Sequence, residues 1–392
     1  MSDPFPANRP LNAGKFLRVM AVCWGLGLVI AVFAQFPWLV ERVYAQGIGV
    51  WIARILAWMT AWYPYSIGEV LTLAVLVVLV GGFAAVCVQC TRKRRQWRNG
   101  FARYGLWLVT AAHVAVIAFY AVWGLNYARV DVFERQGWER LATGDAAPGA
   151  VDELADLAEE LVSATNAAYV EAMGSEDAGE PSAPSLSLRE IDEVLDRALD
   201  RMAAAQGMPP GFEGRRGPVK PWLGSWFFTK LGIMGMYFPF TGEAQINGMP
   251  PWSVLPHVIA HEKAHQRGIT SEAEANFVGF LACMYSDTPY VQYSGLLFAQ
   301  HQMLGTLGQN DLDRAVEIAE DLLPGVRRDY EAQRDFWARH RGPAQTAARA
   351  LNDAYLRAQR VEGGIASYGM SVELMVLLAR EQGGTLVPGG AE

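Results

Sequence analysis

The sequence predicts a mainly α-helical fold, in which three N-terminal transmembrane helices precede an outer, mostly helical domain with a small β element. The 392 residues are 52% hydrophobic and only 19% charged. The mean hydropathy is +0.11. These values suit a membrane part joined to a water-soluble part. Three long apolar runs occur early in the chain, and most of the remainder carries apolar residues at helical spacing.

The three apolar runs, residues 16–36, 67–89 and 104–125, are long enough to cross a bilayer. Its hydrocarbon core of about 30 Å needs roughly 20 helical residues. Lys15 and Arg18 give the first run a positive N-terminal end, so a cleaved signal peptide is the alternative. The run is long and no small-x-small cleavage site follows it, which favours an uncleaved span. The lipid bilayer is therefore the first expected partner.

Basic residues predict the orientation of the spans. Residues 92–95 read Arg-Lys-Arg-Arg and lie between the second and third spans, and Lys15 and Arg18 lie at the N-terminal end of the first. Cytoplasmic loops carry an excess of Lys and Arg, so both regions are expected in the cytoplasm. An odd number of spans then places everything after Leu125 on the outer side. The formal net charge of −7 argues against nucleic acid as a partner.

Residues 48–65 are apolar apart from Arg54 and are expected to form a helix that lies in the membrane interface. One face of that helix gathers Trp51, Ile55, Trp58 and Trp62. A fourth span here would place the basic loop outside, so that alternative is rejected. Glu69 and His113 lie inside the expected spans, and intramembrane ionisable residues are functional candidates. A hydrogen bond between packed spans is the favoured interpretation of His113.

The chain divides into four expected regions: a membrane domain at residues 1–130, helices at 131–206, a catalytic region at 207–300 and a helical C-terminal region at 301–392. The second region forms a linker with an exposed acidic loop at 175–187. Its helices are expected either to pack on the catalytic region or to space it from the membrane.

The candidate chemistry lies in the pattern His261-Glu262-x-x-His265. Residues four apart stack on one face of a helix, so two imidazoles converge on one metal ion. Glu262 lies one step round the helix, where a carboxylate can take a proton from water that the ion activates. Gly268 is expected to end this helix, and Thr270 or Ser271 to cap a second one. The expected cofactor is one Zn²⁺ ion.

A third ligand is expected from the second helix, where Glu272 and Glu274 compete. These residues differ by about 200° around a helix, so only one can face the ion. Ser271 followed by Glu274 forms a capping box, in which the Glu274 side chain reaches back to the Ser271 amide. Glu272 is thus the predicted ligand, and Asn276, one turn later, is expected to hold its carboxylate in place.

Two further parts of the site are predicted from residue type alone. A strand beside the metal helix can pair with an extended substrate. The expected strand residues are Glu243, Ala244, Gln245, Ile246 and Asn247, and a structural hairpin is the alternative. The candidates for stabilising an oxyanion are Tyr290, Tyr293 and His301, each of which alternatively serves packing.

The chain resembles domain of unknown function 3810, a family of bacterial membrane proteins. The resemblance rests on Tyr65–Glu69, Thr241–Ala244, His261–Phe277, Tyr293–Gly295 and Asn352–Gly369. It implies a location in the bacterial cytoplasmic (inner) membrane, with several spans and an extracytoplasmic C-terminal domain. A looser resemblance is to the gluzincins, zinc metallopeptidases with H-E-x-x-H and a glutamate on a later helix, because Glu272-x-x-Ala-Asn fits their third-ligand pattern. The resemblance implies a zincin-like domain. The early turn at Gly268 is similar to the metzincin arrangement, so the clan stays open.

The leading functional expectation is a membrane-anchored zinc-dependent metallopeptidase. It would hydrolyse a peptide or protein of the envelope on the extracytoplasmic side, with Glu262 activating the zinc-bound water. A zinc hydrolase of a non-peptide amide or ester in the envelope is the first alternative. A non-catalytic membrane scaffold that holds a partner is the second.

Overall fold

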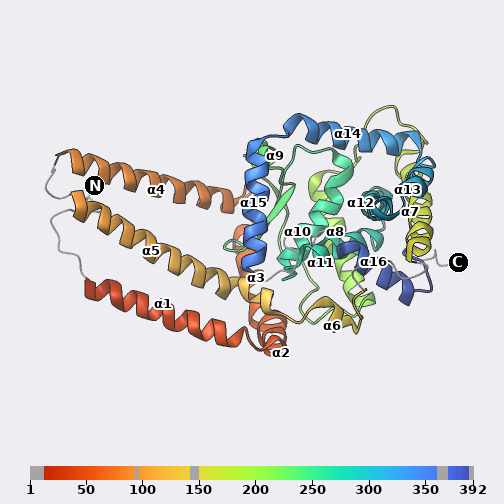
Figure 1. Cartoon of the computed structure of the whole chain (residues 1–392). Coiled ribbons are helices and arrows are strands. Elements are labelled where there is room, and N and C mark those ends of the chain that lie inside the picture. The colour runs from red at the N-terminus through yellow and green to blue at the C-terminus, as the bar shows by residue number, and fades with distance from the viewer. Residues whose placement is uncertain (1–12, 93–96, 142–149, 360–369, 388–392) are drawn as a thin grey trace.

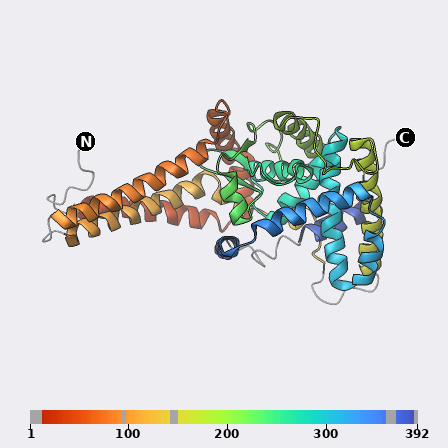
Figure 2. The same cartoon turned by 90° about the horizontal axis from the view of Figure 1, so that it is seen from above.

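A computed structural model describes residues 13–92, 97–141, 150–359 and 370–387 of the chain. Three long helices project from one side of a larger helical body (Figure 1). The same separation is visible from above (Figure 2). The prediction of a mainly α-helical fold with three membrane-spanning helices and a small sheet is confirmed.

The three projecting helices are α1 (Ala13–Phe33), α4 (Ile67–Arg92) and α5 (Trp97–Val122). Their apolar windows are Gly14–Phe33, Ile67–Gln89 and Arg98–Val122, and at most 11% of a window is buried inside the protein. Such a surface needs lipid to cover it, so the chain is a membrane protein. Residues 93–96, part of the basic loop used to predict orientation, lie outside the described residues.

Two span boundaries differ from the prediction. The third helix begins before residue 104 and ends at Val122, because Trp123 leaves the helical conformation and a 3₁₀ turn, η3 (Gly124–Ala128), follows. The first helix ends at Phe33, three residues before the expected end, and a short helix begins at Pro37. His113 bonds through Nδ1 with the Val109 carbonyl of its own helix (2.8 Å), so it does not need a neighbouring span as a partner.

A helical corner joins the first two spans. It comprises α2 (Pro37–Leu39), a π-helix η1 (Val40–Ile48) and α3 (Gly49–Thr60). The predicted apolar face of the interfacial segment is exposed, with exposed fractions of at least 53%, at Trp51, Ile55, Trp58 and Trp62. The opposite face is buried against the outer body, where the Thr60 hydroxyl donates to the Thr241 carbonyl (3.1 Å). Gly242 has φ +68, and a Cβ there would lie 2.7 Å from the Ala57 nitrogen.

The helices of residues 131–206 pack in the core of the outer body. They are α6 (Val132–Gln136), α7 (Ala150–Met173) and α8 (Leu188–Ala205). Helix α7 lies along α12 (Pro289–Asn310), and α8 contacts α10 (Leu255–Gln266) and α11 (Glu272–Met284). Of the two expectations for this region, packing against the helices of residues 207–300 is therefore the one observed. The loop at 175–187 is exposed apart from Ser182 and a few half-buried residues.

A three-stranded sheet lies beside α10. Its strands are β1 (Lys220–Pro221), β2 (Gly235–Phe238) and β3 (Glu243–Ile246), in the order β1-β3-β2. Strand β3 pairs in parallel with β1 and antiparallel with β2. Between β1 and β2 the chain forms α9 (Ser225–Leu231). The short 3₁₀ turn η4 (Trp252–Val254) then leads into α10.

The C-terminal region contains α13 (Leu312–Ala319), α14 (Pro324–His340), α15 (Pro343–Ala358) and α16 (Met370–Glu381). Pro324 and Pro343 each open a helix, a position at which proline is well tolerated. Helix α15 lies across the boundary between the spans and the outer body, whereas α13 lies at the far end (Figure 1). Residues 360–369, which include part of the 352–369 motif, lie outside the described residues.

Buried carboxylates connect the spans to the outer body. Glu243 of β3 accepts hydrogen bonds from the amides of Ile67 (3.0 Å) and Gly68 (2.6 Å), which start α4. It also pairs with the Lys220 ammonium group (2.6 Å). In return, Glu69 of α4 accepts from the amides of Leu223 and Gly224, both at 2.9 Å. Helix α4 and the sheet are therefore held at a fixed distance.

Candidate metal centre

The metal helix α10 ends where the sequence predicts. Gly268 has φ +87, and a Cβ at this position would lie 3.2 Å from the Asn126 side-chain oxygen. Both the conformation and the close approach of Asn126 favour glycine. Ser271 then caps α11, its hydroxyl accepting from the Glu274 amide (3.3 Å). The chain thus reverses within a few residues of His265.

Helix α11 returns against α10 closely enough to present a ligand. A Cβ at Gly279 would lie 3.2 Å from the His261 nitrogen, so the absence of a side chain there lets the two helices approach. Glu272, the first residue of α11, faces the imidazoles of α10. Its Oε2 lies 3.2 Å from His261 Nε2 and 3.5 Å from His265 Nε2.

The donor set of His261, His265 and Glu272 fits a metal ion. The two Nε2 atoms are 3.0 Å apart, and the three donor atoms all lie within 4.8 Å of one another. With bonds of about 2.1 Å in a tetrahedral arrangement, donor atoms are separated by about 3.4 Å. The three observed separations lie close to that value. Two imidazole nitrogens that face each other at this distance need a cation or a proton between them.

The orientation of His265 leaves its Nε2 free for a metal. Its Nδ1 lies 2.7 Å from the Ile269 carbonyl; a carbonyl only accepts, so Nδ1 carries the proton. Burial acts to lower the pKa of His265, but the Glu272 carboxylate raises it to about 9. Burial acts to raise the pKa of Glu272, and His265 and His261 hold it well below its usual range. The carboxylate therefore stays ionised, as a ligand must be.

Glu262 is buried beside the donor set and has one free oxygen. Its carboxylate accepts from the Tyr237 amide of β2, and its Oε2 has no hydrogen-bond partner among the described residues. A side chain at Gly235 would collide with Oε1. Burial raises the pKa of Glu262 to about 7, although the two histidines act to lower it. A base with a pKa near neutrality suits proton transfer.

Aromatic residues from outside the motif surround the donor set, and sequence reasoning did not find them. The Trp123 indole, directly after α5, donates to the His265 carbonyl (3.1 Å). Tyr127 donates to the Tyr355 hydroxyl of α15 (3.1 Å). Burial raises the pKa of both tyrosines, and the nearby Glu272 carboxylate raises it further. The sequence feature that could have pointed to this group is the family motif at residues 352–369, which contains Tyr355.

Tyr290, Tyr293 and His301, the residues expected to stabilise an oxyanion, contact other parts of the outer body. The Tyr293 hydroxyl donates to Asp329 of α14 (2.7 Å), and the Tyr290 hydroxyl donates to the Ser182 carbonyl (3.4 Å). His301 lies against the Tyr330 ring, with centroids 5.4 Å apart. All three belong to α12, whose face toward α7 and α14 they occupy. These contacts favour packing, the alternative given for each of the three residues.

For the expected substrate strand, the structure favours the alternative of a structural hairpin. Residues 243–246 do form a strand, but it is the central one, with β1 on one side and β2 on the other. Both of its edges are hydrogen-bonded, so it cannot pair with a substrate. The Asn247 side chain donates to the Thr229 hydroxyl (2.8 Å) and the Ile233 carbonyl (3.1 Å), which is a structural task.

Two supporting residues have partners other than those expected. Asn276 makes no hydrogen bond to Glu272 in the described part of the chain; its carbonyl bonds with His257 Nε2 (3.2 Å). The Glu274 side chain pairs with Arg135 of α6 and not with the Ser271 amide. The inference that Glu274 has a structural role is thus supported, but the partner is a buried arginine.

The back of the metal helix is held by buried ion pairs. The Lys263 ammonium lies 2.8 Å from Asp192 and 3.0 Å from Asp196 of α8, and Arg267 lies 2.9 Å from Asp196. Two cations thus face two anions, which offsets the cost of burying them. Lys263 is two residues from both His261 and His265, on the opposite side of α10. These pairs fix the rotation of the helix and the direction of its histidines.

The family described as "Protein of unknown function (DUF3810)" matches residues 44–376 of the chain. No curated protein and no solved structure matches the chain. The matched region includes the second and third spans, the donor set and the aromatic residues around it.

The two glutamates of α11 are expected to respond differently to replacement. Glu272→Ala should remove most of the bound metal, since two imidazoles remain as ligands. Glu274→Ala should retain the metal and lower the free energy of unfolding by about 3 kcal/mol, because it leaves Arg135 buried without its partner. Metal analysis and thermal unfolding of both purified variants test this. Metal loss only in Glu274→Ala would show that the donor set is misassigned.

Proposed function

The chain belongs to the DUF3810 family, and from the donor set we propose that it is a membrane-anchored, zinc-dependent metallopeptidase. The observation that carries the proposal is the convergence of His261, His265 and Glu272 beside Glu262, whose Oε2 is free. Two nitrogen donors and one oxygen donor at tetrahedral separations suit Zn²⁺. Three protein ligands leave one position open, as in catalytic zinc sites. H-E-x-x-H with a glutamate on the following helix is similar to the gluzincin pattern.

When bound, zinc supplies a Lewis acid that polarises a carbonyl and makes water more acidic. Glu262 then takes the proton from the attacking water and delivers it to the leaving amine. The Tyr237 amide fixes one carboxylate oxygen, which aims the other at the reacting groups. Because the Tyr355 hydroxyl accepts from Tyr127, its own proton is available to the developing oxyanion.

Strand β2 is the better candidate for binding an extended substrate. The Asn247 amide donates to the Met234 carbonyl (2.7 Å), and alternate residues of an antiparallel strand face their partner strand. Gly235 and Tyr237 therefore direct their backbone groups away from β3, on the side of Glu262. A peptide that adds to this edge would present its scissile bond beside the base.

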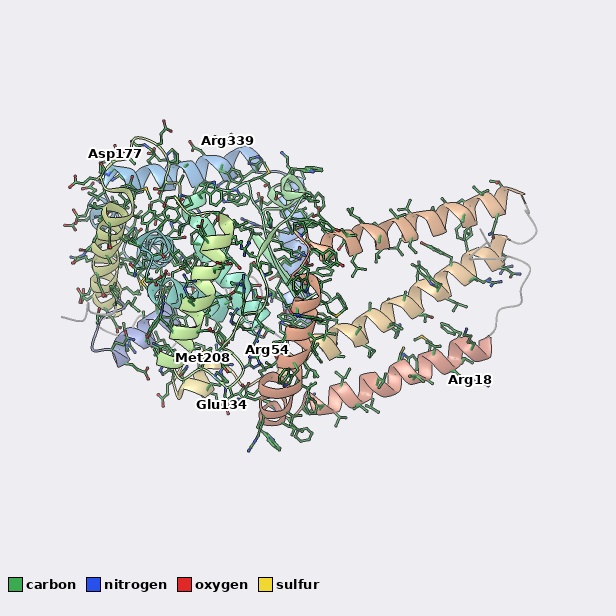
Figure 3. The ribbon with its side chains drawn as sticks, turned by 180° about the vertical axis from the view of Figure 1, so that it is seen from behind. Arg18, Arg54, Glu134, Asp177, Met208 and Arg339 are labelled. Atoms are coloured by element: carbon green, nitrogen blue, oxygen red, sulfur yellow. The ribbon has the colours of Figure 1, made fainter. Side chains whose placement is uncertain are left out.

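The active site is proposed to face the outer side of the bacterial cytoplasmic membrane. Arg18 lies in the half of α1 that is remote from the outer body, whereas Arg54 lies at the junction (Figure 3). Arg98 opens the apolar window of α5, whose other end, Val122, joins the outer body. The basic residues thus gather at the membrane face opposite the donor set, which the positive-inside rule assigns to the cytoplasm.

Replacement of Glu262 tests the reaction. Glu262→Gln should lower turnover of a fluorogenic peptide pool by roughly 10²–10⁴-fold while zinc remains bound, because Glu262 is not a ligand. Glu134→Gln, at an exposed position of α6, serves as the control and should leave turnover unchanged. Full activity of Glu262→Gln would exclude Glu262 as the base. A metal-loaded wild type that cleaves amides or esters but no peptides would favour the non-peptide hydrolase.

Tyr355→Phe should lower kcat by about 10²–10³-fold with little change in KM, since it removes one donor to the oxyanion. Tyr293→Phe is the matched control: it should reduce stability and leave kcat unchanged, because its hydroxyl bonds with Asp329. Steady-state kinetics of both variants provide the measurement. The assignment fails if Tyr293→Phe shows the larger fall in kcat.

Reporter fusions test the orientation. A reporter inserted between α4 and α5 should report the cytoplasm, and one inserted after the exposed Gly179 should report the outer side. Alkaline phosphatase and fluorescent-protein fusions at both positions give complementary signals. Reports from the same side would contradict the proposed topology and direct the search for substrates to the cytoplasm.

A further inference from the structure

Four large apolar side chains are exposed together on the outer body. They are Leu223, Trp226, Phe227 and Met249, with exposed fractions of 77%, 64%, 46% and 44%, and we call them the apolar rim. Two contacts join its two segments: the Gly248 amide donates to the Ser225 hydroxyl (3.2 Å), and the Thr229 hydroxyl donates to the Met249 sulfur (3.5 Å). No charged residue lies between Pro221 and Phe227 or between Gly248 and Trp252.

The position of the rim along the membrane normal is fixed by α4. Glu69, the third residue of the apolar window Ile67–Gln89, accepts from the amides of Leu223 and Gly224. The 23 residues of that window span about 34 Å at 1.5 Å per residue, which matches a hydrocarbon core of about 30 Å. Glu69 therefore lies at the edge of the hydrocarbon, and the rim beside it lies at the same level.

The aromatic face of α3 and the C-terminal end of α15 mark the same level. Trp51, Trp58 and Trp62 are exposed on α3, whose other face is buried against the outer body. After α15, Gln359 accepts from the hydroxyl of Tyr120, a residue inside the apolar window of α5. Helix α15 lies across this boundary (Figure 1). The rim thus continues a belt of apolar and aromatic side chains around the ends of the spans.

From this continuity we propose that the apolar rim lies in the interfacial layer of the lipid bilayer, so that the outer body rests on the membrane surface. Tryptophan and other large apolar side chains prefer this layer. An apolar surface this exposed needs a partner, and the lipid that covers α4 begins where the rim is attached. The lipid around the ends of the spans is that partner, so no second protein is needed.

The proposal narrows the substrate class, and this step rests on the proposed peptidase function. Trp123, the residue directly after α5, bonds to the carbonyl of the ligand His265, and Tyr127 contacts Tyr355. A single side chain, that of Trp123, thus connects the donor set to the end of the third span. Substrates are chains held at the bilayer surface, either membrane proteins near a span end or peptides with a lipid anchor.

Photo-cross-linking in liposomes tests the lipid contact on the full chain. The photoreactive residue p-benzoylphenylalanine is placed at position 226 or 227, in vesicles of phosphatidylethanolamine and phosphatidylglycerol. Position 77, in the middle of α4, is the positive control. Position 312, on α13 at the far end of the outer body, is the negative control, because Leu312 is as exposed as Trp226 (66% against 64%). Phospholipid adducts detected by mass spectrometry are expected at 226, 227 and 77 and not at 312.

Adducts at position 77 without adducts at 226 or 227 would overturn the lipid contact. Bound zinc in each variant, compared with wild type, reports whether the outer body is folded. Position 249 offers a second site on the rim if either aromatic replacement prevents folding.

A spacer series tests the substrate class. The same fluorogenic peptide pool is attached to palmitoyl chains in the vesicles, through a short spacer or through a long polyethylene glycol spacer, at equal surface density. Cleavage should fall about tenfold with the long spacer, since the local concentration near the surface falls with tether length. Equal cleavage would overturn the restriction to surface substrates. Cleavage of neither pool would contradict the proposed peptidase, while the adducts at 226 and 227 still decide the lipid contact.

Discussion

The geometry of the donor set depends on how the third span ends. The Trp123 indole holds the His265 carbonyl, and Arg129 bridges the Gly268 carbonyl (3.1 Å) and the Glu41 carboxylate (2.8 Å) of η1. The turn that brings Glu272 back to the histidines is thus held by residues of the membrane region. A charge-assisted contact of this kind is stronger than a neutral hydrogen bond. The reversal after α10 therefore has a rigid support on one side.

On its other side α10 is fixed by charge. Lys263 and Arg267 are buried with Asp192 and Asp196, and although burial acts to raise the pKa of Asp196, the two cations hold it below its usual value. Removing one member would leave an uncompensated charge in the core, a loss of about 3–5 kcal/mol. The metal helix is thus restrained from both faces, as a preorganised donor set requires.

The sequence carried enough information to predict the local features of the site. Gly268, Ser271 and the spacing of His261 and His265 act within a few residues, and each was placed as expected. The spans were predicted because twenty apolar residues in a row have one stable environment. What was missed depends on contacts between distant parts: that β3 is central, that Glu274 meets Arg135 and that Tyr355 approaches Tyr127. No spacing rule encodes the order of strands or the docking of α15.

The hydrogen bonds between the Glu243 carboxylate and the start of α4 have a consequence for the order in which the protein assembles. The amides of Ile67 and Gly68 are synthesised about 175 residues before their acceptor, so the second span emerges from the ribosome long before the sheet can form. Strand β3 can meet these amides only after it has itself been synthesised, when the second span has already left the ribosome. The proposed hydrolytic site would then form only in chains that have been inserted into the membrane. Under the proposed function, membrane insertion would thus be the step that activates the protein.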